Sequence, residues 1–436
     1  MGHGGFIKTE YEAYLRRLET GITALPMPDH PAARAAWQDV LEILLTPEQA
    51  SLAACVSPTR RLTAEEVARR AGLPLDDTRR RLEALADRGI VFDFVNPRTG
   101  AVKWLLAPAA PGMLDFPMKR LGDDDGVPKA RLARAIEAYF HGDDAFLKEL
   151  IGDTPFFRTL VNEEALEPGD LAEVVDWERS TAIVEGASKI AVSPCTCRHR
   201  AEHFGRRCDA PLDTCLALGG GARFAIRRRF GREIEKPEAL EILARSREHG
   251  LVQMLDNVRG HPTFLCNCCS CCCDVLRLLN DYGLPSVIPS GFEARADADR
   301  CAGCGTCVAA CPVRAISESD DGAAPTIDAG RCIGCGLCAA ACPQAATAMV
   351  RRAAPPHVPA NVIERTVNRM IERGRLPHLL YDEGASRGAR FMNLILRAIC
   401  ALPPAQQALA SRQLRSRFVD FVIRTRSRPR SRKTPS

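Results

Sequence analysis

The sequence predicts an α+β protein made of several domains, and three observations support this fold class. Capping signals near the N-terminus mark a set of helices that is followed by a hairpin. A middle segment alternates strand-like and helical patterns and is rich in cysteine, and a short cysteine motif then occurs twice in tandem. The 436 residues suffice for about two to four domains with hydrophobic cores.

We expect six segments along the chain. They are an N-terminal helical domain with a hairpin over 1–110, a linker with a helical segment over 111–166, a cysteine-rich α/β domain over 167–290, the domain of the tandem motif over 291–350, C-terminal helices over 351–424 and a disordered basic tail over 425–436. The tail, rich in Arg, Ser and Pro, is either simply solvated or binds an acidic partner surface.

The N-terminal domain shows several local signals of helix ends. Thr63 and Glu66 form a capping box for a helix that Gly72 closes, and Asp76 or Asp77 caps the next helix. The expected elements are helices over 10–18, from 47, over 64–71 and from 76 to 88, and strands over 90–95 and 101–106.

This order of helices and hairpin resembles the winged-helix family over about residues 36–106. Members of that family commonly place the third helix in the DNA major groove. Basic side chains on that helix here are Arg79, Arg80, Arg81 and Arg88. Asp76 and Asp77, however, put negative charge at the end that would approach the phosphates. We therefore expect a docking role rather than nucleic-acid binding.

The cysteine-rich domain contains two groups of cysteines. The first group is Cys195, Cys197, Cys208 and Cys215, and the second is Cys266, Cys268, Cys269, Cys271, Cys272 and Cys273. Each follows an apolar, strand-like run, 189–192 or 263–265, so both could lie at the carboxyl ends of strands in one sheet and face one another. The first group alone suffices for one four-thiolate site, whereas adjacent thiols of the second cannot all reach one cubane.

Three interpretations of these upstream cysteines stay open. They could hold a further iron–sulfur cluster, a zinc ion or a thiol redox pair. Arg198, His199 and Arg200 would stabilise negative charge on a reduced cluster or thiolate, unless they are merely exposed basic residues. Neither a P-loop nor a dinucleotide-binding fingerprint occurs in the sequence.

The tandem motif reads C-x2-C-x2-C-x3-C-P, and its copies begin at Cys301 and Cys332, 31 residues apart. This spacing is typical of bacterial ferredoxins with two [4Fe–4S] clusters, in which the fourth cysteine of each run serves the other cluster. The predicted ligands are Cys301, Cys304, Cys307 and Cys342 for one cluster, and Cys332, Cys335, Cys338 and Cys311 for the other. Zinc sites usually space their cysteines as two separated pairs.

The C-terminal segment predicts helices over 361–373, 392–402 and 406–422, with Gly374 closing the first. We expect them to pack on the rest of the chain and to shield one cluster.

The full order of motifs resembles a group of 4Fe–4S dicluster-domain proteins. It comprises P-C-x-C-R-H, two spaced cysteines, C-N-C-C-x-C-C-C and the tandem motif, after a winged-helix-like segment. The resemblance implies iron–sulfur binding and electron transfer, but no named reaction.

We therefore expect a cytoplasmic iron–sulfur protein that exchanges electrons with a redox partner protein, as a carrier or redox subunit. The first ten residues are polar, and no stretch of about 18 apolar residues could span a membrane. No triad or pair of carboxylates is evident, so no catalytic residue is assigned. The alternatives are a reductase acting on a substrate at the upstream cysteines and a redox-sensing regulator whose output is the winged helix.

Overall fold

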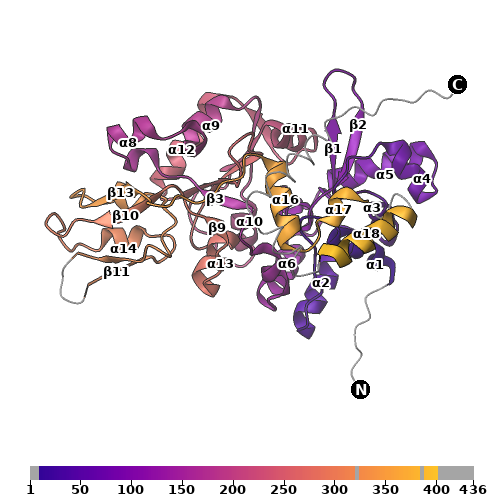
Figure 1. The fold of residues 1–436 in the computed structure, drawn as a ribbon, viewed down its shortest axis with the longest axis horizontal. Helices are drawn as coiled ribbons and strands as arrows, with labels where there is room; N and C mark the ends of the chain where they lie inside the picture. The colour runs from indigo at the N-terminus through magenta and orange to yellow at the C-terminus, as the bar shows by residue number, and fades with distance from the viewer. Residues whose placement is uncertain (1–8, 320–323, 383–386, 401–436) are drawn as a thin grey trace.

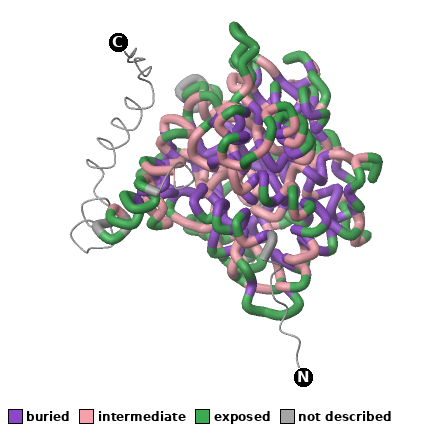
Figure 2. The backbone as a smooth tube through the Cα atoms, turned by 90° about the vertical axis from the view of Figure 1, so that its right-hand side faces the viewer, coloured by how far each residue is buried: buried purple, intermediate pink, exposed green. Residues whose placement is uncertain are grey.

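The computed structural model describes residues 9–319, 324–382 and 387–400. Figure 1 shows the N-terminal helices at one end of the molecule and the segment with the tandem motif at the other, with the cysteine-rich domain between them. Figure 2 shows buried positions in the interior along most of the chain and exposed positions concentrated at its edges. The fold is mixed helix and strand, as predicted.

The N-terminal domain has the predicted order of helices and hairpin. Its elements are α1 (Thr9–Glu19), α2 (Pro31–Leu44), α3 (Pro47–Ala54), α4 (Ala64–Ala71), α5 (Leu75–Asp87), β1 (Val91–Val95) and β2 (Val102–Leu106). The capping box of Thr63 and Glu66 is present, and Gly72 ends α4 with φ 66°. The N-cap of α5 is Pro74 and not an aspartate, and α2 was not predicted. Pro31 is the first residue of α2, where a missing N–H costs no hydrogen bond.

The linker leads into a helix pair that packs on the N-terminal domain. Its elements are a π-helical turn η1 (Ala110–Asp115), a 3-10 turn η2 (Phe116–Met118), α6 (Lys129–His141) and α7 (Ala145–Leu150). The helical segment expected within 111–166 is thus two helices, because α6 ends at His141 with Gly142 as its C-cap. The apolar side chains of both helices pack in one core with α2.

A seven-stranded sheet forms the centre of the cysteine-rich domain, in the order β6-β4-β5-β8-β7-β3-β9. Its strands are β3 (Phe157–Thr159), β4 (Ile190–Ser193), β5 (Cys215–Leu218), β6 (Arg232–Ile234), β7 (Val252–Asp256), β8 (Phe264–Cys268) and β9 (Val287–Ile288). Every pairing is antiparallel except that of β3 with β9. β3 comes from the segment that we expected to be linker.

Helices and short turns surround this sheet. They are η3 (Glu163–Ala165), α8 (Pro168–Glu173), η4 (Asp176–Glu178), α9 (Ser180–Gly186), α10 (Thr196–Glu202), α11 (Gly219–Arg227), α12 (Lys236–Glu248) and α13 (Asp274–Tyr282). Leu216 and Leu265 pack with Leu243 of α12 in one core. Met254 and Cys268 point to the other core, which includes Leu276 of α13.

The tandem motif folds as two similar units. The elements are β10 (Phe292–Ala296), α14 (Thr306–Ala310), β11 (Ile316–Ser317), β12 (Thr326–Ile327), α15 (Leu337–Ala340) and β13 (Thr347–Arg351), with β10 paired to β13 and β11 to β12. Each cysteine loop enters its helix through a glycine in the left-handed region, Gly305 with φ 70° and Gly336 with φ 81°.

The C-terminal helices are α16 (Val362–Glu372), α17 (Pro377–Leu380) and α18 (Arg387–Cys400). Asn361 caps α16, and Gly374 follows it with φ 63°. The predicted helix over 406–422 and the tail lie outside the described residues. The expected shielding of a cluster is wrong for α17 and α18, because they lie beside α1 and α3, at the end opposite α14 (Figure 1). α16 instead pairs with β7, through Arg365 and Asp256.

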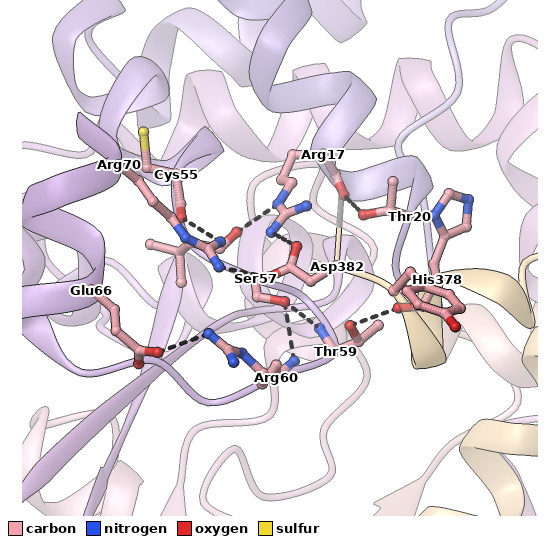
Figure 3. Close-up of polar contacts among 12 residues, drawn as sticks. Arg17, Thr20, Cys55, Ser57, Thr59, Arg60, Glu66, Arg70, His378 and Asp382 are labelled. Atoms are coloured by element: carbon pink, nitrogen blue, oxygen red, sulfur yellow. Dashed lines mark hydrogen bonds and ion pairs between the residues drawn. The ribbon is translucent and has the colours of Figure 1, made fainter. Parts of the chain in front are cut away.

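A buried carboxylate joins the C-terminal segment to the N-terminal helices. Figure 3 shows Asp382 between two arginines, at 2.5 Å from Arg17 and 2.9 Å from Arg70. Burial by itself would raise the pKa of Asp382, but the two guanidinium groups outweigh it and hold the pKa below its usual value. Thr59 Oγ1 also donates to the carbonyl of His378, at 3.1 Å. The two ends of the described chain are therefore one structural unit.

Asp382→Asn should lower the free energy of unfolding by about 3–5 kcal/mol, because it leaves two mostly buried arginines without their anion. Urea denaturation at neutral pH would measure the loss. The exposed ion pair of Asp39 with Arg131 provides the control, since Asp39→Asn should change little. The contribution of Asp382 should disappear as the pH falls through its folded-state pKa. Equal losses in both variants would contradict this assignment.

Candidate metal centres

The sheet brings three cysteine-bearing segments to one of its ends. β4 and β8 both run antiparallel to β5, so they run parallel to each other on its two sides. Ser193, at the end of β4, pairs with Cys215, and the register of β5 with β8 places Cys266 opposite Cys215. The carboxyl ends of β4 and β8 therefore lie at the same end of the sheet, on either side of the start of β5, as the sequence predicted.

Six of the upstream thiols form one interacting group, here called the six-thiol centre. Its members are Cys195, Cys197, Cys215, Cys266, Cys268 and Cys273. Cys197 interacts with both Cys195 and Cys273, which joins the segment after β4 to the segment after β8. Cys215 interacts with Cys266 as the strand register requires. All six side chains are partly or fully buried.

The other four upstream thiols form a second group, here called the four-thiol site. Their sulfur atoms all lie within 4.8 Å of one another, and they belong to Cys208, Cys269, Cys271 and Cys272. Cys271 Sγ and Cys272 Sγ are 3.6 Å apart. The first cysteine group is therefore divided, because Cys208 joins three members of the second group. The spacing of the cysteines in the sequence did not indicate that Cys208 would group with Cys269, Cys271 and Cys272.

Two charged side chains at the six-thiol centre were not predicted. Lys119 Nζ, from the residue after η2, lies 3.3 Å from Cys215 Sγ and 3.3 Å from Ser193 Oγ. Burial opposes its charge, but Asp115 and the neighbouring thiols outweigh this effect and raise the pKa of Lys119. On the other side of the centre, Asp274 Oδ2 lies 3.7 Å from Cys197 Sγ. Burial raises the pKa of this carboxyl to about 7, against the influence of the Arg200 guanidinium.

The three basic residues after Cys197 are buried, so they are not exposed surface residues. Arg198 donates hydrogen bonds to Thr214 Oγ1 at 2.7 Å and to the carbonyl of Asn267 at 2.6 Å, and it thereby ties the two cysteine segments together. Arg200 pairs with Asp274 next to Cys197. His199 Nδ1 instead contacts the carbonyl oxygen of Met118 at 2.7 Å. Arg198 and Arg200 thus lie close enough to the upstream thiols to interact with them electrostatically, whereas His199 points elsewhere.

The thiols of the tandem motif lie in two sets. The second thiol set lines one cavity together with apolar side chains, and it consists of Cys311, Cys332, Cys335 and Cys338. Burial raises the pKa of Cys338 to about 12, and Cys332 and Cys311 add to this effect. Four thiols around one cavity are a donor set suited to a [4Fe–4S] cubane. These are the four cysteines that the motif assigns to one cluster.

The first thiol set is the other four cysteines that the motif assigns to one cluster, Cys301, Cys304, Cys307 and Cys342, and its loop is more open. Cys342 influences the pKa of both Cys304 and Cys307, although it belongs to the other run. The loop from 302 to 304 is exposed, whereas Ile333 and Gly334 in the corresponding loop are buried. The two copies of the motif therefore differ in their access to solvent.

A continuous buried core connects the second thiol set with the six-thiol centre. Val313, Ile333 and Leu337, which neighbour the second set, pack in the same core as Cys268 and Cys273. Cys266, Cys311, Cys332 and Cys335 are partly buried against this core. Part of the second thiol set and part of the six-thiol centre therefore share one apolar core.

Comparison with known proteins identifies one part of this chain. Residues 293–343 match the family model described as 4Fe-4S dicluster domain. This segment is a ferredoxin-type iron–sulfur domain. The ferredoxin interpretation of the tandem motif is thereby confirmed, and the family points to iron–sulfur electron transfer. The match does not extend to the upstream cysteines. Neither the curated proteins nor the solved structures gave a match.

Hydropathy adds one negative observation for the described part of the chain. None of its helices combines the length and the apolar character that crossing a bilayer requires.

The exchange of the fourth cysteine between the two runs can be tested with Cys311→Ala. Because Cys311 lines the cavity of Cys332, Cys335 and Cys338, the variant should lose or strongly alter the EPR signal of that cluster. The signal of the first thiol set should change much less, and Cys342→Ala should give the reverse pattern. An effect of Cys311→Ala confined to the first set would contradict the exchange.

Proposed function

We propose that this protein is an electron-transfer protein that connects a redox partner protein with the six-thiol centre. In this proposal the ferredoxin domain holds two [4Fe–4S] clusters, and the six-thiol centre holds a further iron–sulfur cluster. The clusters supply one-electron chemistry when bound. The protein binds them, sets their surroundings and determines which centre a partner can approach.

The single observation that carries the proposal is the core shared by the second thiol set and the six-thiol centre. Val313 and Ile333 from the ferredoxin domain and Met254 from β7 pack into it together. Apolar packing excludes solvent, and burial is one of the means by which a protein sets the potential of a cluster. A shared dry core is therefore suited to electron transfer between neighbouring centres.

The unequal exposure of the two sets supports a direction for the path. Cys304 is exposed at the surface, so the first thiol set is the side that a partner protein can approach. Cys335 packs against the core that contains Cys268 and Cys273, and Cys338 is buried. We propose that a partner exchanges electrons at the first set and that the six-thiol centre is the inner end of the path.

Positive charge around the six-thiol centre fits a negatively charged cluster. Lys119 contacts Cys215, Arg198 acts on Cys195 and Cys268, and Arg200 is close to Cys197. Cations beside a thiolate-bound cluster stabilise its reduced form and raise its reduction potential. Six thiols exceed the four that one cubane needs, so either some are not ligands or the centre holds a larger cluster.

The winged-helix-like domain is proposed as a structural module. The arginines of α5 have acidic partners, with Arg79 at 2.7 Å from Glu65, Arg80 at 3.1 Å from Asp77 and Arg81 at 2.8 Å from the same carboxylate. These pairs reduce the positive charge that phosphate binding would require.

The same domain is anchored to the cysteine-rich domain by one buried guanidinium. Arg228, just after α11, lies 2.5 Å from Glu83, 3.1 Å from Asp87 and 3.1 Å from Asp93. Phe92 of β1 also packs edge-on against Phe224 of α11. α5 and β1 are thus used for an internal contact, which supports docking over DNA binding.

Cys197→Ser tests the proposed centre directly. Because Cys197 joins Cys195 to Cys273, the variant should lose the iron of the six-thiol centre and keep the about eight irons of the ferredoxin domain. Iron and sulfide analysis of anaerobically purified protein, with EPR, would measure both. Chemical reduction of the ferredoxin clusters should survive, while turnover with the physiological partner should fail.

Cys55→Ser is the matched control, because Cys55 lies at the end of α3 and donates to the carbonyl of Ser51, at 3.5 Å. If Cys197→Ser kept its full iron content and its activity with the partner, the six-thiol centre would hold no cluster and the protein would be a carrier with two clusters. Substrate turnover that depends on Cys197 without any protein partner would favour the reductase alternative.

The regulator alternative can be tested with charge reversal of Arg79, Arg80 and Arg81. Any affinity for DNA should be weak and unspecific before and after the change, because these side chains already have acidic partners. Footprinting at several salt concentrations would measure it. A sequence-specific footprint that the reversal abolishes would favour the regulator.

A further inference from the structure

We infer that the four-thiol site binds a single zinc ion, separate from the six-thiol centre, and that this ion fixes the turn between β8 and α13. The inference rests on the grouping of Cys208, Cys269, Cys271 and Cys272, whose sulfur atoms lie within 4.8 Å of one another. It does not depend on what the six-thiol centre holds.

The distances between the sulfur atoms favour one metal ion over a cubane. Zinc binds thiolates at about 2.3 Å in a tetrahedron, so the ligand sulfurs lie about 3.8 Å apart. Cys271 Sγ and Cys272 Sγ are 3.6 Å apart, close to one edge of such a tetrahedron. A cubane has a separate iron for each thiolate, so its four ligands lie farther apart than those of one ion. The compact group therefore has the size of a tetrahedral zinc site.

The two upstream groups are distinct although they alternate along the chain. Cys269 interacts with Cys272 and Cys208, and Cys271 interacts with Cys269. Cys268, only one residue before Cys269, interacts instead with Cys266 and Cys273. Neighbouring side chains point in different directions, so one short turn can supply ligands to two sites. Six cysteines within eight residues are explained by this double use.

The surroundings suit a closed structural zinc site. Four thiolates give zinc a full set of ligands and a net negative charge, with no open position for a substrate. Arg198 is fully buried and acts electrostatically on both Cys269 and Cys208. The same side chain donates a hydrogen bond to the carbonyl of Asn267. It therefore holds the turn in place and also stabilises the negative charge of the thiolates.

The position of the site indicates what the ion does. Cys208 lies in the loop after α10, whereas the other three ligands lie between Cys268 and Cys273. Binding one ion would tie that loop to the turn and fix the separation of Cys268 and Cys273. Both of these thiols belong to the six-thiol centre. The zinc ion would thus hold the neighbouring centre in shape without taking part in electron transfer.

Metal analysis of the full-length, anaerobically purified protein tests this inference. Zinc should be present at about one ion per chain, and EXAFS at the zinc edge should show four sulfur ligands at about 2.3 Å. Cys208→Ser and Cys271→Ser should each lower the zinc content at least about fivefold and leave the ferredoxin EPR signals unchanged. Cys271 is exposed, so its replacement should disturb packing least.

Two control variants separate this inference from the proposed function. Cys195→Ser should keep the zinc while it changes the iron of the six-thiol centre, and Cys55→Ser should change neither metal. Zinc that persists in both Cys208→Ser and Cys271→Ser would overturn the inference. Zinc-free wild-type protein would also overturn it, and iron lost on Cys208→Ser would then assign a cluster to these thiols.

Discussion

The antiparallel pairing of β4, β5 and β8 is the constraint on which the upstream centre depends. Because β5 is antiparallel to both of its neighbours, the end of β4, the start of β5 and the end of β8 lie at the same end of the sheet. Cys195, Cys215 and Cys266 come from distant parts of the chain, yet the register alone brings their segments together. A shift of one residue in β8 would turn Cys266 to the opposite face, so the sheet registers and the thiol chemistry are coupled.

The buried charges around the six-thiol centre fit the proposed anionic centre. Lys119 is nearly inaccessible to solvent, and a buried ammonium is costly unless it is paired. Asp115, 3.5 Å away, is one partner, and the thiols of Cys215 and Cys266 are the others. Neutral thiols would leave the positive charge of the buried Arg198 unbalanced, because Asp115 pairs with Lys119 and Asp274 pairs with Arg200. Thiolates bound to metal would balance it, so the electrostatics and the proposed centre support one another.

Local signals in the sequence predicted the elements that local interactions determine. The capping box of Thr63, the helix end at Gly72 and the loops of the tandem motif follow from residues a few positions apart. Contacts across the chain were not predictable, because the sequence carries no marker of them. Lys119 reaches a cysteine almost a hundred residues later, and Asp382 joins the segment after α17 to α1 through a single carboxylate. For the same reason the spacing of Cys208 suggested the wrong partners.

The two copies of the cysteine motif show how tertiary contacts give different properties to equal sequences. Gly305 and Gly336 have the same left-handed conformation, but a side chain at 305 would meet only the end of Glu318. At 336 it would come within 3.0 Å of Ala165 and 3.3 Å of Asn162. The backbone N–H of Asn162 donates to the carbonyl of Cys335 at 2.9 Å, and that of Ser290 donates to the carbonyl of Ile333 at 3.0 Å. The second loop is therefore fixed against the cysteine-rich domain while the first faces solvent, and this difference gives a symmetric motif an inner and an outer side.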